Sequence, residues 1–188
     1  MMTAEGDAGG AERGCMVVRQ RRNLMHAFGS IPRNPGASRT RPLYDPEPGA
    51  DDSGKLVLVV DDSNMICRIV KFSLQKYGIS TMLFHSGVDA LNALKEGAAP
   101  VPDLVLLDIN LPHMNGYDVA TLLSHKREFR SVPIVMLSGH DGIIDRFRAK
   151  RAGADEFISK PFDEPELVNK IFPLLDLDIP EDMVGHKA

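Results

Sequence analysis

The stretch KLVLVVDDSN, residues 55–64, places five consecutive apolar residues directly before two acidic ones. Short apolar runs without alternating polar residues are typical of strands that are covered on both faces. Residues 51–53 spell the same DDS triplet but follow no apolar run, so the triplet by itself predicts nothing. What distinguishes Asp61 and Asp62 is their position at the end of a predicted strand.

Four more strands are predicted downstream of this one. The apolar runs lie at Thr81–Phe84, Leu104–Leu107 and Ile134–Leu137, and a weaker one lies at Glu156–Ser159. The first three runs are short and rich in apolar residues, as strands of a buried sheet are. In the fourth, two apolar residues stand between polar ones.

Apolar residues at three- and four-residue spacing predict five helices that alternate with these strands. The five stripes are Ile66, Ile69, Val70, Ser73, Leu74 and Tyr77; Val88, Leu91 and Leu94; Val119, Leu122 and Leu123; Ile143, Ile144, Phe147 and Ala152; and Leu167, Val168, Ile171 and Leu174. Gly78 stands where a C-cap glycine would end the first helix. Such alternation predicts an α/β fold with a parallel sheet between two layers of helices.

Length and composition are those of one globular domain. The chain has 188 residues, of which 43% are hydrophobic, enough to bury a core. No apolar run reaches the roughly 20 residues that span a bilayer, and residues 1–15 lack the apolar region of a secretory signal. Cys15 and Cys67 are too few for a disulfide framework or a zinc site. We therefore expect a cytoplasmic protein without a transmembrane segment, with Cys67 an ordinary helix residue.

Charge and composition divide the chain near residue 54. Residues 1–50 hold seven arginines against five acidic residues, whereas residues 51–188 carry a net charge of −6, which argues against a nucleic-acid-binding domain. Prolines recur between residues 29 and 53, so residues 1–54 are expected to form a disordered extension. Within it, residues 17–31 could form a basic amphipathic helix, although a poorly ordered tail is favoured. The domain is predicted at 55–175, followed by a short acidic tail at 176–188.

Polar side chains follow four of the predicted strands. Because the carboxyl ends of parallel strands meet at one edge of the sheet, Asp61, Asp62 and Asp108 are expected to converge there. Like charges so close raise one another's pKa unless a cation neutralises them, and oxygen ligands suit Mg²⁺. Ser138 and Lys160 would add a hydroxyl and an ammonium group. Such a set is suited to phosphoryl transfer, with Asp108 the natural nucleophile.

These residues, in this order, resemble the receiver domain of two-component response regulators. The resemblance rests on Asp61 and Asp62 after the first strand, the segment DINLPHMNG at 108–116, Ser138, and Lys160 followed by proline. It covers roughly two-thirds of the chain, from Lys55 to about Leu175. It implies a flavodoxin-like, doubly wound (βα)5 fold with strand order 2-1-3-4-5.

The resemblance also implies a role for each site residue. Asp108 resembles the phosphoacceptor, which receives its phosphoryl group from a histidine kinase or a histidine phosphotransfer protein. Asp62 and Asp108 would bind Mg²⁺ directly, together with the backbone carbonyl of Asn110. Asp61 would act mainly through a bound water molecule, and Lys160 would pair with the phosphoryl group.

Two further positions match the switch of the family. Ser138 would move inward to hydrogen-bond a phosphoryl oxygen, and Phe157 matches the aromatic residue that turns from exposed to buried when it does so. Many relatives carry tyrosine at that position, whereas Phe157 has no hydroxyl group for a hydrogen-bonded readout. Phe157 as a plain core residue is an almost equal alternative. His140 flanks the site at a position that tunes phosphoryl lifetime in the family, although a solvent-facing loop histidine is favoured slightly.

Simpler roles and other functions stay open. Residues 62–64 could merely cap the first helix, and residues 161–163 could open the last one. The output is expected to be a partner surface made by the fourth helix with its basic segment Arg146–Arg151, the strand holding Phe157, and the last helix; a solvated charged face is the alternative. A stand-alone receiver is favoured over a phosphate shuttle or sink in a relay. An aspartyl-phosphate phosphatase would need a second acid where Asn110 stands.

Overall fold

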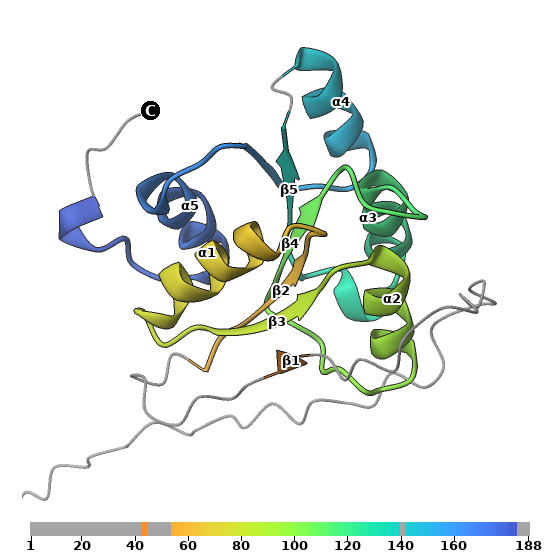
Figure 1. Cartoon of the computed structure of the whole chain (residues 1–188), viewed down its shortest axis with the longest axis horizontal. Helices are drawn as coiled ribbons and strands as arrows, with labels where there is room; N and C mark the ends of the chain where they lie inside the picture. Colours follow the sequence, from red (N-terminus) through yellow and green to blue (C-terminus); the bar gives the residue numbers. More distant parts are fainter. Residues whose placement is uncertain (1–42, 45–53, 140–141, 184–188) are drawn as a thin grey trace, which may run out of the picture.

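The computed structural model describes residues 43–44, 54–139 and 142–183 of the chain. The predictions about residues 17–31 and about His140 lie outside these residues. In the described part, a sheet is covered by helices on both faces (Figure 1). No helix among these residues combines the length and the hydropathy needed to cross a bilayer.

Six strands make up the sheet, in the order β1-β3-β2-β4-β5-β6. Their bounds are Leu43–Tyr44 (β1), Leu56–Val60 (β2), Ser80–Phe84 (β3), Leu104–Asp108 (β4), Ile134–Ser138 (β5) and Glu156–Ser159 (β6). The five strands from β2 onward pair in parallel. Counted from β2, their order is 2-1-3-4-5, so the predicted flavodoxin-like topology is confirmed.

The short strand β1 corrects the expectation that residues 29–53 hold no regular structure. Leu43 and Tyr44 pair antiparallel with Leu83 and Met82 of β3. Without them β3 would be the edge of the sheet and would expose a row of unpaired backbone groups. Prolines at positions 42 and 46 flank the pair, which fits a strand limited to two residues.

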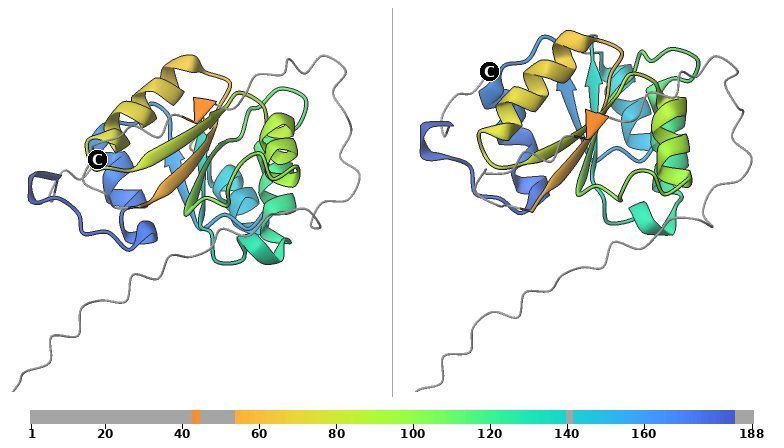
Figure 2. Two further views of the ribbon diagram at one scale, coloured as in Figure 1. Left: turned by 90° about the horizontal axis from the view of Figure 1, so that it is seen from below. Right: turned by 60° about the horizontal axis from the view of Figure 1, so that its bottom comes forward.

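Helices α1 (Asn64–Gln75) and α5 (Glu164–Ile171) cover one face of the sheet. Helices α2 (Gly87–Lys95), α3 (Gly116–Ser124) and α4 (Ile143–Arg151) lie on the other (Figures 1 and 2). Short 3₁₀ helices occupy Arg127–Phe129, Pro173–Leu175 and Glu181–Met183. Because both faces are covered, alternate residues of β2 enter opposite cores: Leu58 and Val60 pack with α2 and α3, and Val57 and Val59 with α1 and α5. This explains the unbroken apolar runs.

The predicted helical stripes are right for α2, where Val88, Leu91 and Leu94 are all buried, and for α5, where Leu167, Val168 and Ile171 are. Elsewhere some members point to solvent. These are Ile69 on α1 (39% exposed), Leu122 on α3 (39%), and Ile144 and Phe147 on α4 (66% and 64%).

The error at α4 has a clear physical reason. Ala149 and the C-cap residue Ala152 form the buried side of this helix. A small side chain lets a helix approach its neighbours closely, so the larger apolar residues lie on other sides of α4. The predicted stripe is therefore right for Ala152 but wrong for Ile144 and Phe147.

The chain continues to pack beyond residue 175. Leu177, Ile179 and Met183 are partly buried against the core between the sheet, α1 and α5. The Asn169 side chain of α5 donates a hydrogen bond to the Met183 carbonyl at 3.2 Å. Part of the predicted tail at 176–188 therefore packs against the domain.

Two aspartates anchor the amino ends of strands. Asp103 accepts a hydrogen bond from the Leu56 backbone N–H at 2.8 Å, and Asp155 accepts one from Ile134 at 2.9 Å. In return, each aspartate donates its own N–H to the carbonyl of the same strand residue. The two acids thus fix the start of β2 and of β5 by reciprocal pairs of bonds.

Replacing Asp155 with alanine is expected to lower the free energy of unfolding by about 1 kcal/mol, since the first N–H of β5 loses its partner. Chemical denaturation followed by circular dichroism measures the change. Asp155→Asn keeps an acceptor oxygen and should recover most of the loss. Equal losses in both variants would contradict the assignment of this hydrogen bond.

Candidate phosphoacceptor and metal site

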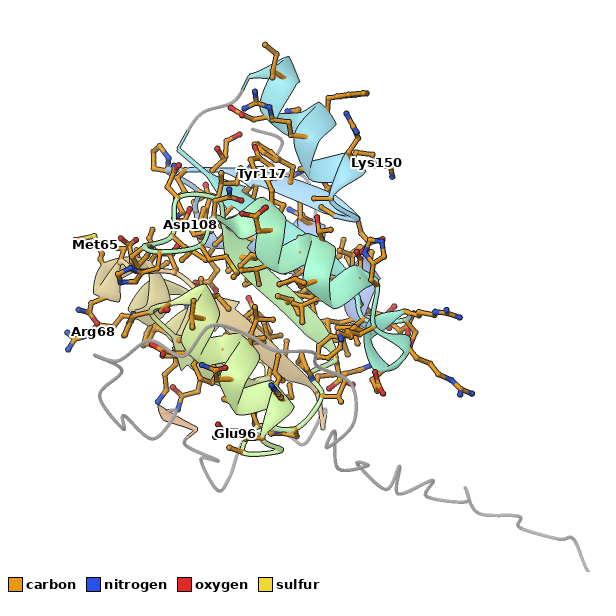
Figure 3. The ribbon with its side chains drawn as sticks, turned by 90° about the vertical axis from the view of Figure 1, so that its right-hand side faces the viewer. Met65, Arg68, Glu96, Asp108, Tyr117 and Lys150 are labelled. Carbon is orange, nitrogen blue, oxygen red and sulfur yellow. The ribbon has the colours of Figure 1, made fainter. Side chains whose placement is uncertain are left out.

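The polar residues predicted to converge do meet at the carboxyl edge of the sheet. Asp61 directly follows β2, Asp108 ends β4, Ser138 ends β5 and Lys160 directly follows β6. In Figure 3, Asp108 lies toward the end of the domain marked by Met65, at the beginning of α1, and away from Glu96, at the end of α2. Parallel strand direction alone brings these residues together.

Lys160 lies between two buried carboxylates. Its Nζ atom is 2.6 Å from Oδ2 of Asp61 and 2.9 Å from Oδ1 of Asp108. Asp61 is completely buried and Asp108 is 4% exposed, so both pairs are shielded from water. The other carboxylate oxygen of Asp61 accepts a hydrogen bond from the Ser63 N–H at 2.9 Å. The Lys160 N–H in turn donates to the Ser138 carbonyl at 2.6 Å.

Three carboxylates share this site with one ammonium group. Oxygen atoms of Asp61, Asp62 and Asp108 lie within 4.8 Å of one another. With Lys160 the cluster carries a formal charge of −2, which a divalent cation would neutralise. Oxygen-only donors and one exposed member, Asp62, fit Mg²⁺, which keeps several of its water ligands. The carbonyl of Asn110, an exposed residue after β4, stays a predicted ligand.

Burial and pairing shift two of these groups in the same direction. Burial raises the pKa of Asp61, although the hydrogen bonds from Lys160 and Ser63 oppose the change. Burial alone would lower the pKa of Lys160, but its hydrogen bonds and ion pairs with Asp61 and Asp108 outweigh it and raise the pKa. The ammonium group is thus held charged, whereas the buried Asp61 carboxylate has a net electrostatic cost. A bound cation would reduce that cost.

Replacing Asp61 with asparagine is expected to raise the melting temperature of the metal-free protein at neutral pH, because a buried charge is removed while Asp108 remains as the partner of Lys160. Thermal denaturation in the presence of a chelator measures the gain. The folded-state pKa of Asp61 is raised, so its cost is present above that pKa and fades as the pH falls toward the ordinary value of 3.8. The advantage of the variant should shrink over the same range, and an advantage that grew on acidification would contradict the assignment.

Serine and asparagine caps, rather than the site carboxylates, begin the surrounding helices. The Ser63 side chain accepts from the Ile66 N–H at the start of α1, and Asn115 accepts from Asp118 at the start of α3. Residues 62–64 thus do supply the cap of α1, as their alternative interpretation held, but through Ser63 and not through Asp62. Asp163 caps α5, as predicted for residues 161–163.

The loop after Asp108 requires a glycine at position 116. A Cβ atom on Gly116 would lie 2.1 Å from the backbone oxygen of Asp108, much closer than atoms approach without bonding. The Gly116 N–H donates to the Ile109 carbonyl at 2.9 Å, and this bond closes the loop. The predicted structural role of Gly116 thus has a direct cause: two backbone segments touch beside the acceptor residue.

The two predicted switch residues lie in adjacent strands. Ser138 is 2% exposed at the end of β5. Phe157 in β6 is buried, with the Arg146 guanidinium 4.9 Å from the centre of its ring. The structure therefore holds Phe157 in the inward position, beneath a cation supplied by α4.

Sequence reasoning missed three residues around the site: Tyr117, Arg146 as a partner of Phe157, and His85. Tyr117 follows Gly116 and donates from its hydroxyl to Oδ1 of Asp145 on α4 at 3.1 Å. Burial, and then this hydrogen bond, raises the pKa of Tyr117 to about 12. His85 directly follows β3. The rule that selected Asp61, a polar residue at the end of an apolar strand, would have found His85 as well.

Comparison with known proteins identifies the family. Residues 57–172 match the response regulator receiver domain. The chain belongs to the response regulator receiver family. The matched residues include strands β2 to β6, apart from Leu56 at the start of β2. They also include every site residue named above.

Relatives of this receiver domain differ in what surrounds it. Protein PilG of Pseudomonas aeruginosa is 32% identical over 132 residues, which are 70% of this chain and 96% of PilG. The DNA-binding response regulator MtrA of Mycobacterium tuberculosis is 39% identical over 121 residues, which are 64% of this chain but only 50% of MtrA. The receiver thus matches nearly all of one relative and half of another.

Solved structures agree with the fold. The chemotaxis response regulator CheY4 of Vibrio cholerae is 27% identical, with a TM-score of 0.59, over 64% of this chain and 98% of that one. A putative response regulator of Chloroflexus aurantiacus is 26% identical, with a TM-score of 0.60, over 65% and 98% of the two chains. The likeness therefore covers the receiver domain.

Proposed function

We propose that this receiver domain accepts a phosphoryl group on Asp108 from the phosphohistidine of a histidine kinase or a histidine phosphotransfer protein. The observation that carries the proposal is the buried Asp108 carboxylate, held 2.9 Å from the Lys160 ammonium within a cluster of three acids. A carboxylate oxygen attacks phosphorus, and the bond from phosphorus to the histidine nitrogen breaks. The electron pair stays on the imidazole, and the product is an acyl phosphate on Asp108.

The remaining residues of the site take roles that suit this reaction. Lys160 neutralises charge on the phosphoryl oxygens, and the Ser138 hydroxyl donates a hydrogen bond to one of them. Asp62, Asp108 and the Asn110 carbonyl would hold Mg²⁺ directly, and Asp61 would act mainly through a bound water molecule. When bound, the cation supplies neutralisation of the negative charge that gathers as phosphate and carboxylates meet.

We place the output of the domain on α4, β6 and α5. Two large apolar side chains, Ile144 and Phe147, are exposed on α4, next to the basic residues of Arg146–Arg151. Arg146 also covers Phe157, so this surface is linked to the predicted switch strand. The domain acts as a stand-alone cytoplasmic receiver that signals by binding a partner protein when Asp108 is phosphorylated.

Two measurements test this function. Incubation with Mg²⁺ and acetyl phosphate should give a stable adduct, whereas rapid turnover of many phosphomonoesters would indicate a phosphatase. Affinity capture with and without beryllofluoride, a phosphoryl mimic, should retain a partner only in the activated state. Loss of that partner in Phe147→Ser but not in Leu122→Ser, an exposed apolar control on α3, would locate the surface on α4. Phosphorylation without any state-dependent partner would indicate a phosphate shuttle or sink.

A further inference from the structure

Two side chains contact the backbone carbonyl of Asp61. The Nδ1 atom of His85 is 3.0 Å from this oxygen, and the Cys67 Sγ atom is 3.4 Å from it. A carbonyl oxygen can only accept, so Nδ1 of His85 carries the proton in this contact. His85 comes from the connection between β3 and α2, and Cys67 from α1. One peptide oxygen is therefore held from two separate elements.

This oxygen belongs to the peptide unit that joins Asp61 to Asp62. The N–H of Asp61 donates to the Phe84 carbonyl at 3.0 Å, and its carboxylate oxygens are held by Ser63 and Lys160. With these groups fixed, the orientation of the peptide plane decides in which direction the Asp62 side chain leaves the backbone. Asp62 is exposed, so core packing does not fix the position of its side chain.

Core packing does not explain the contact of His85 with the Asp61 carbonyl, and the same Nδ1 atom lies 3.9 Å from the Cys67 Sγ atom. Cys67 is 2% exposed and packs in the core, so its position is explained by burial. His85 is exposed and contributes no core packing. Its neighbour Ser86 already caps α2 by accepting from the Asp89 N–H. What His85 adds is a donor aimed at the Asp61 carbonyl.

We propose that His85 is a positioning residue for the divalent-cation site: its Nδ1–H orients the peptide between Asp61 and Asp62, and so aims the Asp62 carboxylate at the cation. The inference rests on the proposed function, since that function requires the cation. Groups that orient metal ligands without touching the metal affect metal affinity strongly. His85 acts through one neutral hydrogen bond, so the expected effect is smaller, about fivefold in affinity for Mg²⁺.

The test compares two variants of the full-length chain by calorimetric titration with Mg²⁺, before any phosphorylation. Asparagine carries its amide nitrogen the same number of bonds from the backbone as Nδ1 of histidine, so His85→Asn keeps the donor. His85→Ala removes it. We expect His85→Ala to weaken Mg²⁺ binding about fivefold and His85→Asn to remain within about twofold of the wild type. At saturating Mg²⁺, all three proteins should react with acetyl phosphate at similar maximal rates.

Each other outcome overturns the inference. Equal Mg²⁺ affinity in His85→Ala and the wild type would show that the contact orients nothing, while the proposed function would stand. Equal weakening in both variants would show that the imidazole acts by something other than its Nδ1 donor. A wild-type protein that neither binds Mg²⁺ nor forms an adduct would remove the proposed function and the inference together. Melting temperatures of the three proteins identify any loss of affinity that comes from unfolding.

Discussion

Replacing Asp108 with asparagine should abolish phosphorylation by acetyl phosphate. The amide has nearly the shape of the carboxylate, but it is neutral and a poor nucleophile, so no acyl phosphate can form at this position. The same change removes one negative charge from the cluster of three acids and weakens the pair with Lys160. We expect a loss of at least about a thousandfold in the rate of adduct formation, a size typical of removing a reacting group. Intact-protein mass spectrometry over time measures it.

Asp118 provides a matched control for this variant. It is exposed in the first turn of α3 and lies outside the cluster of acids. Asp118→Asn should therefore react at the wild-type rate. Both variants should remain folded, because each substitution conserves the shape of the side chain. If Asp108→Asn were phosphorylated as fast as Asp118→Asn, another residue would have to be the acceptor.

Alanine at position 116 should destabilise the fold more than any other small substitution near the site. A methyl group there would lie 2.1 Å from the Asp108 backbone oxygen, so either the loop or the start of α3 must move. Alanine gains up to about 1 kcal/mol over glycine inside a helix, but displacing packed backbone costs about 3 kcal/mol. We expect a net loss of about 2 kcal/mol in the free energy of unfolding, measured by denaturation with a chelator present.

Gly139 offers the matching control for Gly116→Ala. It follows Ser138 at the same edge of the sheet, and a Cβ atom there would meet no other atom within 4 Å. Gly139→Ala should leave the stability unchanged to within about 0.5 kcal/mol. If both alanine variants lost the same stability, the close approach at Gly116 would not be the cause.

The sheet and most of the site could be predicted from sequence because two strong local signals agree. Apolar runs such as Leu56–Val60 identify buried strands, and strand direction then places their last residues at one edge. Asp61, Asp108 and Lys160 meet for this reason alone, although they are far apart along the chain. Each of these residues lies at a strand end or directly after one. A prediction that misplaced a strand end by one residue would therefore have missed them.

Other features depend on contacts that no local pattern encodes. The two-residue strand β1 exists because β3 offers an unpaired edge, which is a property of the finished sheet. The exposure of Ile144 and Phe147 follows from the close approach allowed by small residues on the other side of α4. Arg146 on α4 lies over the ring of Phe157 in β6, and this contact depends on the conformations of both side chains. Predicting such contacts requires the packed structure.

Burial also decided the electrostatics. The sequence predicts that neighbouring acids raise one another's pKa, and the pKa of Asp61 is indeed raised. The largest cause, however, is loss of water around a completely buried carboxylate, while the nearby Asp108 contributes least. Burial to this degree depends on residues far away in the sequence, such as Phe84 and Lys160, which contact Asp61 only in the folded chain.

The most direct measurement is to map the phosphorylated residue. The protein is incubated with acetyl phosphate, with and without Mg²⁺, and then reduced with borohydride, which converts an acyl phosphate to a stable alcohol; peptides are sequenced by mass spectrometry. The account predicts one modified residue, Asp108, and only in the presence of Mg²⁺. A modification at another residue, or one on Asp108 that forms equally well in a chelator, would contradict it.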